Sequence, residues 1–202
     1  MKKTLIALFL FIATTAISQL LPQKAEDISP LLIGEKMPSA DLVTADGATV
    51  RFSDIIKKKK TVLIVYRGGW CPYCNEHLSE VGKMEEKLLA LGYQIVAVSP
   101  DAPEQLKETG QKNTLNYTLL SDQKGTLIKS AGLAYKAPAY NEKDLIISQP
   151  DKALQFLPVA SLFILSRNSE ILFEYINPNF KNRISGYLLF AAAKVFAENK
   201  EN

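Results

Sequence analysis

The sequence has little cysteine, histidine or tryptophan: two, one and one among its 202 residues. So few cysteines exclude a small scaffold held together by many disulfides. Glycine and proline contribute only 10 residues each, which excludes collagen-like and low-complexity chains. Hydrophobic residues make up 47% of the chain, so it is long enough and apolar enough to bury one sizeable core.

Neither sign of charge is in excess, because 24 basic side chains face 21 acidic ones. The one dense run, Lys57–Lys60, directly precedes an apolar stretch and fits a solvated turn before a buried strand better than a binding patch. Without a basic stripe the sequence gives no reason to expect nucleic acid as a partner.

The apolar stretch that opens the chain, Thr4–Ser18, has 15 residues without a charge, whereas a membrane helix needs about 20. It follows Lys2 and Lys3 and ends on small residues at the two positions that a signal peptidase reads. We therefore expect residues 1–18 to be a signal peptide cleaved before Gln19. This predicts an exported protein, periplasmic or otherwise extracytoplasmic, with no stable membrane insertion after cleavage. An uncleaved membrane anchor is the alternative.

Residues 19–202 are predicted to form one domain that begins with an extended arm over residues 19–38. Continuous or alternating apolar runs predict strands, and apolar residues at intervals of three or four predict helices. Strands alternate with helices and the chain closes with a hairpin and a helix, which indicates a three-layer α/β sandwich. The predicted strands are 61–66, 93–98, 117–120, 161–165 and 171–175, and the predicted helices are 72–91, 103–112, 123–131 and 184–197.

The segment Leu133–Leu157 has no clean period. Long irregular segments in compact domains often contact substrates or partners, so we interpret it as an inserted loop on the functional face. A plain surface insertion is an equally good interpretation.

Both cysteines lie in one tetrad, Cys71-Pro72-Tyr73-Cys74, directly after a predicted central strand and at the start of a predicted helix. Unpaired N–H groups and the positive end of the helix dipole favour the reactive thiolate there, most directly for Cys71. Pro72 suits the first helical position because its missing donor would be unpaired anyway. One helical turn brings Cys74 to Cys71, so the pair can cycle between dithiol and disulfide.

Three other interpretations of the tetrad carry less weight. An inert stapling disulfide would close too short a loop to stabilise the fold much. Zinc needs two further ligands, and the single histidine, His77, lies on the same helix, where a surface position is the simplest expectation. A copper carrier would want a wider cysteine spacing and a distal histidine.

The segment Tyr66–Asn75 (YRGGWCPYCN) resembles the active site of peroxiredoxin-like proteins of the alkyl hydroperoxide reductase C and thiol-specific antioxidant (AhpC/TSA) family. Further similarity covers most of residues 19–202. It is carried by Gly34–Pro38 with Asp46-Gly47, by Val96–Asp101, by Leu120–Asp122, and by Pro158–Leu165 followed by Ile171. The resemblance implies a thioredoxin-like three-layer sandwich with a mixed central sheet and thiol redox chemistry without a bound metal or other cofactor.

The resemblance implies an antioxidant oxidoreductase in which the Cys71 thiolate attacks a hydroperoxide and the resulting sulfenic acid condenses with Cys74. The same dithiol could instead reduce protein disulfides through a mixed disulfide on Cys71 that Cys74 resolves. Either cycle needs a thiol reductant as partner. An oxidising compartment has no glutathione or thioredoxin pool, so we expect this donor to be membrane-tethered or exported.

The sequence departs from the family pattern at two places. The first departure favours the disulfide cycle, and the second leaves the cis-proline position unassigned. Typical members carry Thr or Ser three residues before the attacking cysteine and Pro four residues before that, whereas this chain has Gly68 and Ile64. The cis-proline of thioredoxin-like proteins aligns with Ala160, while Pro158 lies two residues earlier.

Two side chains near the tetrad are candidate substrate-binding residues. Arg67 could lower the pKa of Cys71 or hold a peroxide oxygen, although a surface arginine at a strand end is an equal alternative. Trp70 is expected to shield the Cys71 sulfur and to line the docking surface. Arg167 and Arg183 are further candidate cations without a placement.

Overall fold

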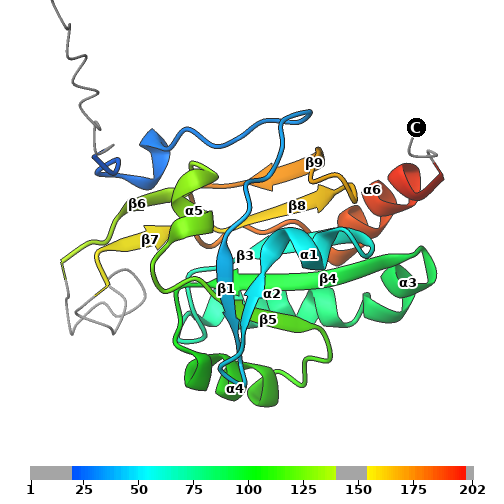
Figure 1. The fold of residues 1–202 in the computed structure, drawn as a ribbon, viewed down its shortest axis with the longest axis horizontal. Coiled ribbons are helices and arrows are strands. Elements are labelled where there is room, and N and C mark those ends of the chain that lie inside the picture. Colours follow the sequence, from blue (N-terminus) through cyan, green and yellow to red (C-terminus); the bar gives the residue numbers. More distant parts are fainter. Residues whose placement is uncertain (1–19, 140–153, 199–202) are drawn as a thin grey trace, which may run out of the picture.

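The computed structural model describes residues 20–139 and 154–198, which fold into strands and helices (Figure 1). The strands are β1 (Asp41–Thr44), β2 (Thr49–Arg51), β3 (Lys60–Val65), β4 (Tyr93–Ser99), β5 (Thr118–Ser121), β6 (Ala134–Lys136), β7 (Phe156–Pro158), β8 (Ser161–Leu165) and β9 (Ile171–Ile176). The helices are the 3-10 turn η1 (Ala25–Asp27) and α1 (Phe52–Ile56), α2 (Pro72–Gly82), α3 (Glu85–Ala90), α4 (Pro103–Lys112), α5 (Thr126–Ser130) and α6 (Gly186–Glu198).

A mixed sheet of seven strands in the order β2-β1-β5-β4-β3-β8-β9 forms the centre of the molecule. β3 runs parallel to β4, and β4 to β5, whereas β8 joins β3 antiparallel. Parallel pairing brings the carboxyl ends of β3 and β4 to the same edge of the sheet. The cysteine tetrad follows β3 and Asp101 follows β4, so this edge carries both.

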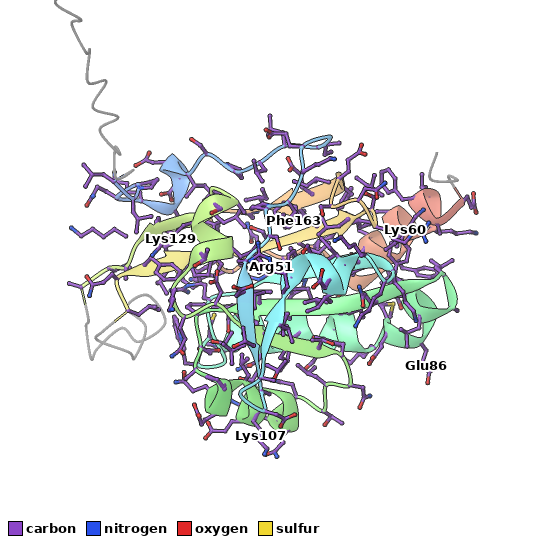
Figure 2. The ribbon with its side chains drawn as sticks, in the orientation of Figure 1. Arg51, Lys60, Glu86, Lys107, Lys129 and Phe163 are labelled. Atoms are coloured by element: carbon purple, nitrogen blue, oxygen red, sulfur yellow. The ribbon has the colours of Figure 1, made fainter. Side chains whose placement is uncertain are left out.

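Helices cover both faces of the sheet. Alternate residues of each central strand therefore pack into two separate hydrophobic cores, one on each face. Along β3, Val62 and Ile64 pack with α2, α3, α4 and α6, whereas Leu63 and Val65 pack with α1, α5 and the arm. Figure 2 shows Phe163 in the interior, while Glu86 and Lys107 point outward at the edges. These layers confirm the predicted three-layer α/β sandwich with a mixed sheet.

The predicted strands are all present, but the long helix predicted over 72–91 is two helices. α2 ends at Gly82, and α3 begins at Glu85 after a turn. Glycine is the poorest helix former after proline, so an interruption costs least there. The short helix α1 was not predicted, since five residues are too few to show a period.

The arm packs along the last hairpin of the sheet. The N–H of Gly34 donates to the carbonyl of Ile171, and the N–H of Ile171 returns a hydrogen bond to Glu35. Ile28 and Leu31 lie against the core on the α5 side. The signal peptide predicted for residues 1–18 lies outside the described residues. Among the residues described, no helix is both long and apolar enough to cross a bilayer.

Two stretches of the irregular segment Leu133–Leu157 contribute strands to a small sheet. β6 pairs antiparallel with β7, with Ala134 opposite Pro158. Residues 140–153 of this segment lie outside the described residues.

Candidate active site

The cysteine tetrad lies where the sequence places it, at the junction of β3 and α2. Cys71 is the last residue before the helix, and its extended backbone (φ −84°, ψ 116°) turns into Pro72 at the first helical position. Its carbonyl accepts the N–H groups of Cys74 and Asn75, both at 3.1 Å. Both cysteines are free thiols and both are buried, with none of the surface of Cys71 exposed (0%).

The two thiols differ in their ease of ionisation. The pKa of Cys71 is lowered to about 6, chiefly because the Cys74 thiol donates a hydrogen bond to its sulfur, with smaller contributions from the backbone N–H of Cys74 and from the Arg67 and Arg183 cations. Burial opposes this effect without cancelling it. The pKa of Cys74 is raised well above its usual value by burial and by the neighbouring Cys71. At neutral pH the arrangement therefore holds one thiolate, on Cys71, and one proton, on Cys74.

Arg67 is a buried part of the site, so its interpretation as a surface arginine is wrong. Only 1% of the residue is exposed. Its guanidinium carbon lies 4.8 Å from the ring centroid of Trp70 and 4.6 Å from that of Phe180, which places the cation against both aromatic faces. It also hydrogen-bonds the Tyr135 hydroxyl. Since Tyr135 belongs to β6, this part of the irregular segment contributes to the site and is not a plain surface insertion.

Asp101 holds the loop before the tetrad from the neighbouring strand. Its Oδ2 accepts the N–H of Gly69 at 2.8 Å and the hydroxyl of Ser99 at 3.0 Å. Burial raises the pKa of Asp101 to about 6 despite these hydrogen bonds. The segment Val96–Asp101, which carries part of the family resemblance, includes this residue, but no signal in the sequence indicated that it would hold the loop before Cys71.

The backbone at Gly68 leaves no room for a side chain. Its φ is +150°, a value that residues with a Cβ rarely adopt. A Cβ there would lie 2.6 Å from Cδ1 of Trp70 and 2.7 Å from Oδ1 of Asp101. The hydroxyl residue that typical relatives carry at this position therefore cannot be restored by substitution alone.

A loop between β9 and α6, residues 177–185, adds side chains from the far end of the chain. Phe180 stacks on Arg67, and its ring meets that of Tyr73 edge-on at 5.8 Å. Nη2 of Arg183 lies 3.6 Å from the sulfur of Cys74. Phe180 was not predicted, because nothing local in the sequence distinguishes it from a packing residue.

Arg167, for which the sequence gave no placement, lies away from the tetrad, and His77 is placed differently from expectation. Arg167 lies in the turn after β8, at the end of that strand remote from the tetrad, because Leu165 pairs with Thr61 and Ser161 with Val65. His77 is buried rather than on the helix surface. Its pKa is lowered to about 4 by burial and by the Arg183 cation, so the imidazole is neutral, and it hydrogen-bonds the backbone of Ile184.

Residues 20–139 and 154–198 include both the expected cis-proline position and the tetrad for which a zinc site was considered. Within these ranges no peptide bond is cis, and Ala160 directly precedes β8, beside the end of β3. The same ranges hold no group of three or more His, Cys, Asp and Glu side chains that could bind a metal ion.

Comparison with known proteins adds to this geometry. The AhpC/TSA family profile matches residues 33–172. Peroxiredoxin bcp1 of Schizosaccharomyces pombe is 31% identical over 112 residues, which are 55% of this chain and 57% of that protein. Peroxiredoxin Bcp of Escherichia coli is 26% identical over 106 residues, 52% and 67% of the two chains. The match thus spans less than two thirds of the first relative.

Solved structures agree on the fold. Reduced Prx3 of Vibrio vulnificus superposes with a TM-score of 0.69 at 18% identity, covering 81% of this chain and 99% of that one. Peroxidoxin BcpB of Mycobacterium tuberculosis gives 0.64 at 15% identity, covering 81% and 96%. These likenesses confirm the thioredoxin-like sandwich that the resemblance implied.

Proposed function

Because the chain belongs to the AhpC/TSA family, we propose that it is a thiol peroxidase that reduces hydroperoxides, with Cys71 as the attacking thiolate and Cys74 as the resolving cysteine. The observation that carries this proposal is the asymmetry of the pair. A buried thiol with a pKa of about 6 lies beside a buried thiol that keeps its proton. The relatives named peroxiredoxins support the peroxide as substrate.

The reaction follows from this asymmetry. The Cys71 thiolate attacks one peroxide oxygen, the O–O bond breaks, and the leaving alkoxide or hydroxide takes a proton to give an alcohol or water. Cys71 is then a sulfenic acid. The Cys74 sulfur attacks the Cys71 sulfur, the S–O bond breaks, and hydroxide leaves as water once protonated. The Cys71–Cys74 disulfide returns to the dithiol by two-electron reduction through an external dithiol.

Arg67 and Trp70 are the proposed substrate-binding residues. The Arg67 guanidinium favours negative charge on the Cys71 sulfur and can donate to a peroxide oxygen. Trp70 is partly exposed, and its ring lies against this cation. Since the Cys71 sulfur is buried, a substrate can reach it only where a partly buried aromatic side chain such as Trp70 moves aside.

We also propose that the protein works outside the cytoplasm and takes electrons from a membrane-tethered or exported dithiol protein. The basis is the pair of lysines followed by 15 uncharged residues at the start of the chain. The amino-terminal sequence of the protein recovered from its native cell checks the cleavage before Gln19. An intact leader would contradict it.

Reduction of protein disulfides is the second candidate function, and the geometry at Gly68 favours it. Typical peroxide-reducing relatives carry a hydroxyl residue there, and this backbone has no room for one. The same Cys71 thiolate would then attack a disulfide sulfur, and Cys74 would release the substrate thiol.

Stopped-flow mixing of the reduced protein with hydrogen peroxide separates the two functions. The fluorescence of Trp70, the sole tryptophan and the direct neighbour of Cys71, reports on oxidation of that sulfur. A peroxidase predicts a second-order rate many orders of magnitude above that of a free thiol, with loss of the signal in Cys71→Ser. A rate like that of a free thiol, together with fast reduction of a protein disulfide, would refute the peroxidase and support the second function.

A further inference from the structure

Three contacts hold the loop 177–185 against α2. The ring of Phe180, in this loop, contacts that of Tyr73 in the first turn of the helix. At the other end of the loop the N–H of Gly186 donates to Oε1 of Glu80 at 2.7 Å. Between them, buried His77 hydrogen-bonds the backbone of Ile184. Three successive turns of α2 thus hold the segment that carries Arg183.

Arg183 is directed at one sulfur of the pair. Its Nη1 donates to the carbonyl of Asn182 at 2.7 Å, which fixes the guanidinium, and its Nη2 reaches the sulfur of Cys74 at 3.6 Å. The side chain is partly buried, so water screens its charge incompletely. Arg67, by contrast, acts more strongly than Arg183 on Cys71.

Cys74 has the greater need of a cation. Its sulfur is buried, and the groups that interact with it are the Cys71 sulfur, the backbone of Arg67, Arg183, Asp101 and Tyr66. Burial opposes ionisation of Cys74, as does the negative charge of Cys71 while Cys71 is a thiolate, and the effect of burial remains once Cys71 is oxidised. Yet Cys74 must act as a thiolate when it attacks the oxidised Cys71.

We infer that Arg183 is a catalytic residue of the resolving step, in which its guanidinium stabilises the Cys74 thiolate as that sulfur attacks Cys71. The inference rests on the proposed function, and it applies equally to its disulfide-reducing alternative. In either case Cys74 gives up a proton, its sulfur bonds to the Cys71 sulfur, and the group already on Cys71 leaves with the electron pair. That group is hydroxide from a sulfenic acid or a thiolate from a mixed disulfide.

The size of the effect follows from the chemistry of thiolates. An opposite charge within about 4 to 6 Å shifts a pKa by about 1 to 3 units. Loss of that charge raises the pKa of Cys74 by this amount and lowers its thiolate fraction correspondingly. A more basic thiolate is also a better nucleophile, with a Brønsted slope of about 0.4–0.5, so about half of the loss in rate, on a logarithmic scale, is recovered. The net expectation for Arg183→Gln is therefore a resolving step about 3- to 60-fold slower.

The test measures attack by Cys74 separately from attack by Cys71. The reduced full-length protein is mixed with one equivalent of an aromatic disulfide whose released thiolate is coloured. The first release reports attack by Cys71, and the second reports displacement by Cys74. A parallel series with hydrogen peroxide follows the two phases through Trp70. Measurement near pH 8 keeps Cys71 ionised, since its pKa is about 6.

Arg183→Gln should slow the second phase by the stated factor in both series and leave the first phase within about twofold. Lys181→Gln is the matched control, because Lys181 is an exposed cation two residues earlier on the same loop. Arg183→Lys, which keeps the charge, should recover most of the rate. A thermal melt for each variant shows whether the fold is retained.

A second phase that is equally fast in Arg183→Gln and in the unchanged protein overturns the inference. Slowing of the first phase alone would also overturn it, because Arg183 would then serve Cys71. Failure of the proposed function looks different. The peroxide series would show no fast first phase in any variant, while the aromatic disulfide series would still report on Arg183.

Discussion

The Cys74 thiol is predicted to be the main cause of the low pKa of Cys71, and Cys74→Ala tests this directly. A hydrogen bond to a charged group is worth about 1.5–3 kcal/mol. One pKa unit corresponds to about 1.36 kcal/mol, so loss of the donor should raise the Cys71 pKa by about 1 to 2 units. From its present value of about 6, the pKa would reach about 7 to 8.

The consequence is large at neutral pH. With a pKa of about 6, about nine tenths of Cys71 is thiolate at pH 7, whereas a pKa of about 8 leaves about one tenth. The titration is followed by thiolate ultraviolet absorbance and, independently, by the pH dependence of alkylation. In the unchanged protein the first ionisation belongs to the pair of thiols and must be compared as such.

Cys74→Ser is the matched control, because its hydroxyl can still donate to the Cys71 sulfur. It should keep the Cys71 pKa close to about 6, whereas Cys74→Ala should not. If Cys74→Ala keeps a Cys71 pKa of about 6, as Cys74→Ser is expected to, the reasoning is refuted, and the backbone N–H of Cys74 and the cations Arg67 and Arg183 must lower the pKa instead. If both variants titrate near a free cysteine, the Cys74 sulfur itself, not a hydrogen bond, is required.

Two further predictions concern stability. Gly68→Ala should cost about 2–5 kcal/mol, because overlap with Trp70 and Asp101 adds to backbone strain, whereas Gly92→Ala, at a φ of +87° with open space, should cost only about 1–2 kcal/mol. Equal costs in urea unfolding would argue against the overlap. Burial raises the folded-state pKa of Asp101 to about 6 from 3.8. Its contribution to stability is therefore fully present below about pH 4 and declines by up to about 3 kcal/mol as pH rises through about 6. Asp101→Asn should remove this decline, and an unchanged pH profile would contradict it.

Local patterns in the sequence determined the sheet and the reactive pair. The run Thr61–Tyr66 is apolar on both faces because β3 lies between two helical layers, so its pattern reflects its place in the sheet. The tetrad places two thiols one helical turn apart regardless of the rest of the fold. Pro72 fits the first position of a helix and interrupts a strand, so the site at the junction of the two elements could be predicted.

Only the tertiary structure decided which side chains surround the two sulfurs. Phe180 and Arg183 are more than 100 positions from the tetrad, and no spacing rule links them to it. Arg67 adjoins the motif, yet its burial depends on Trp70 on one side and Phe180 on the other. The space at Gly68 likewise depends on Asp101 from the next strand. Such contacts arise from how elements pack against one another, and periodicity within one element carries no information about them.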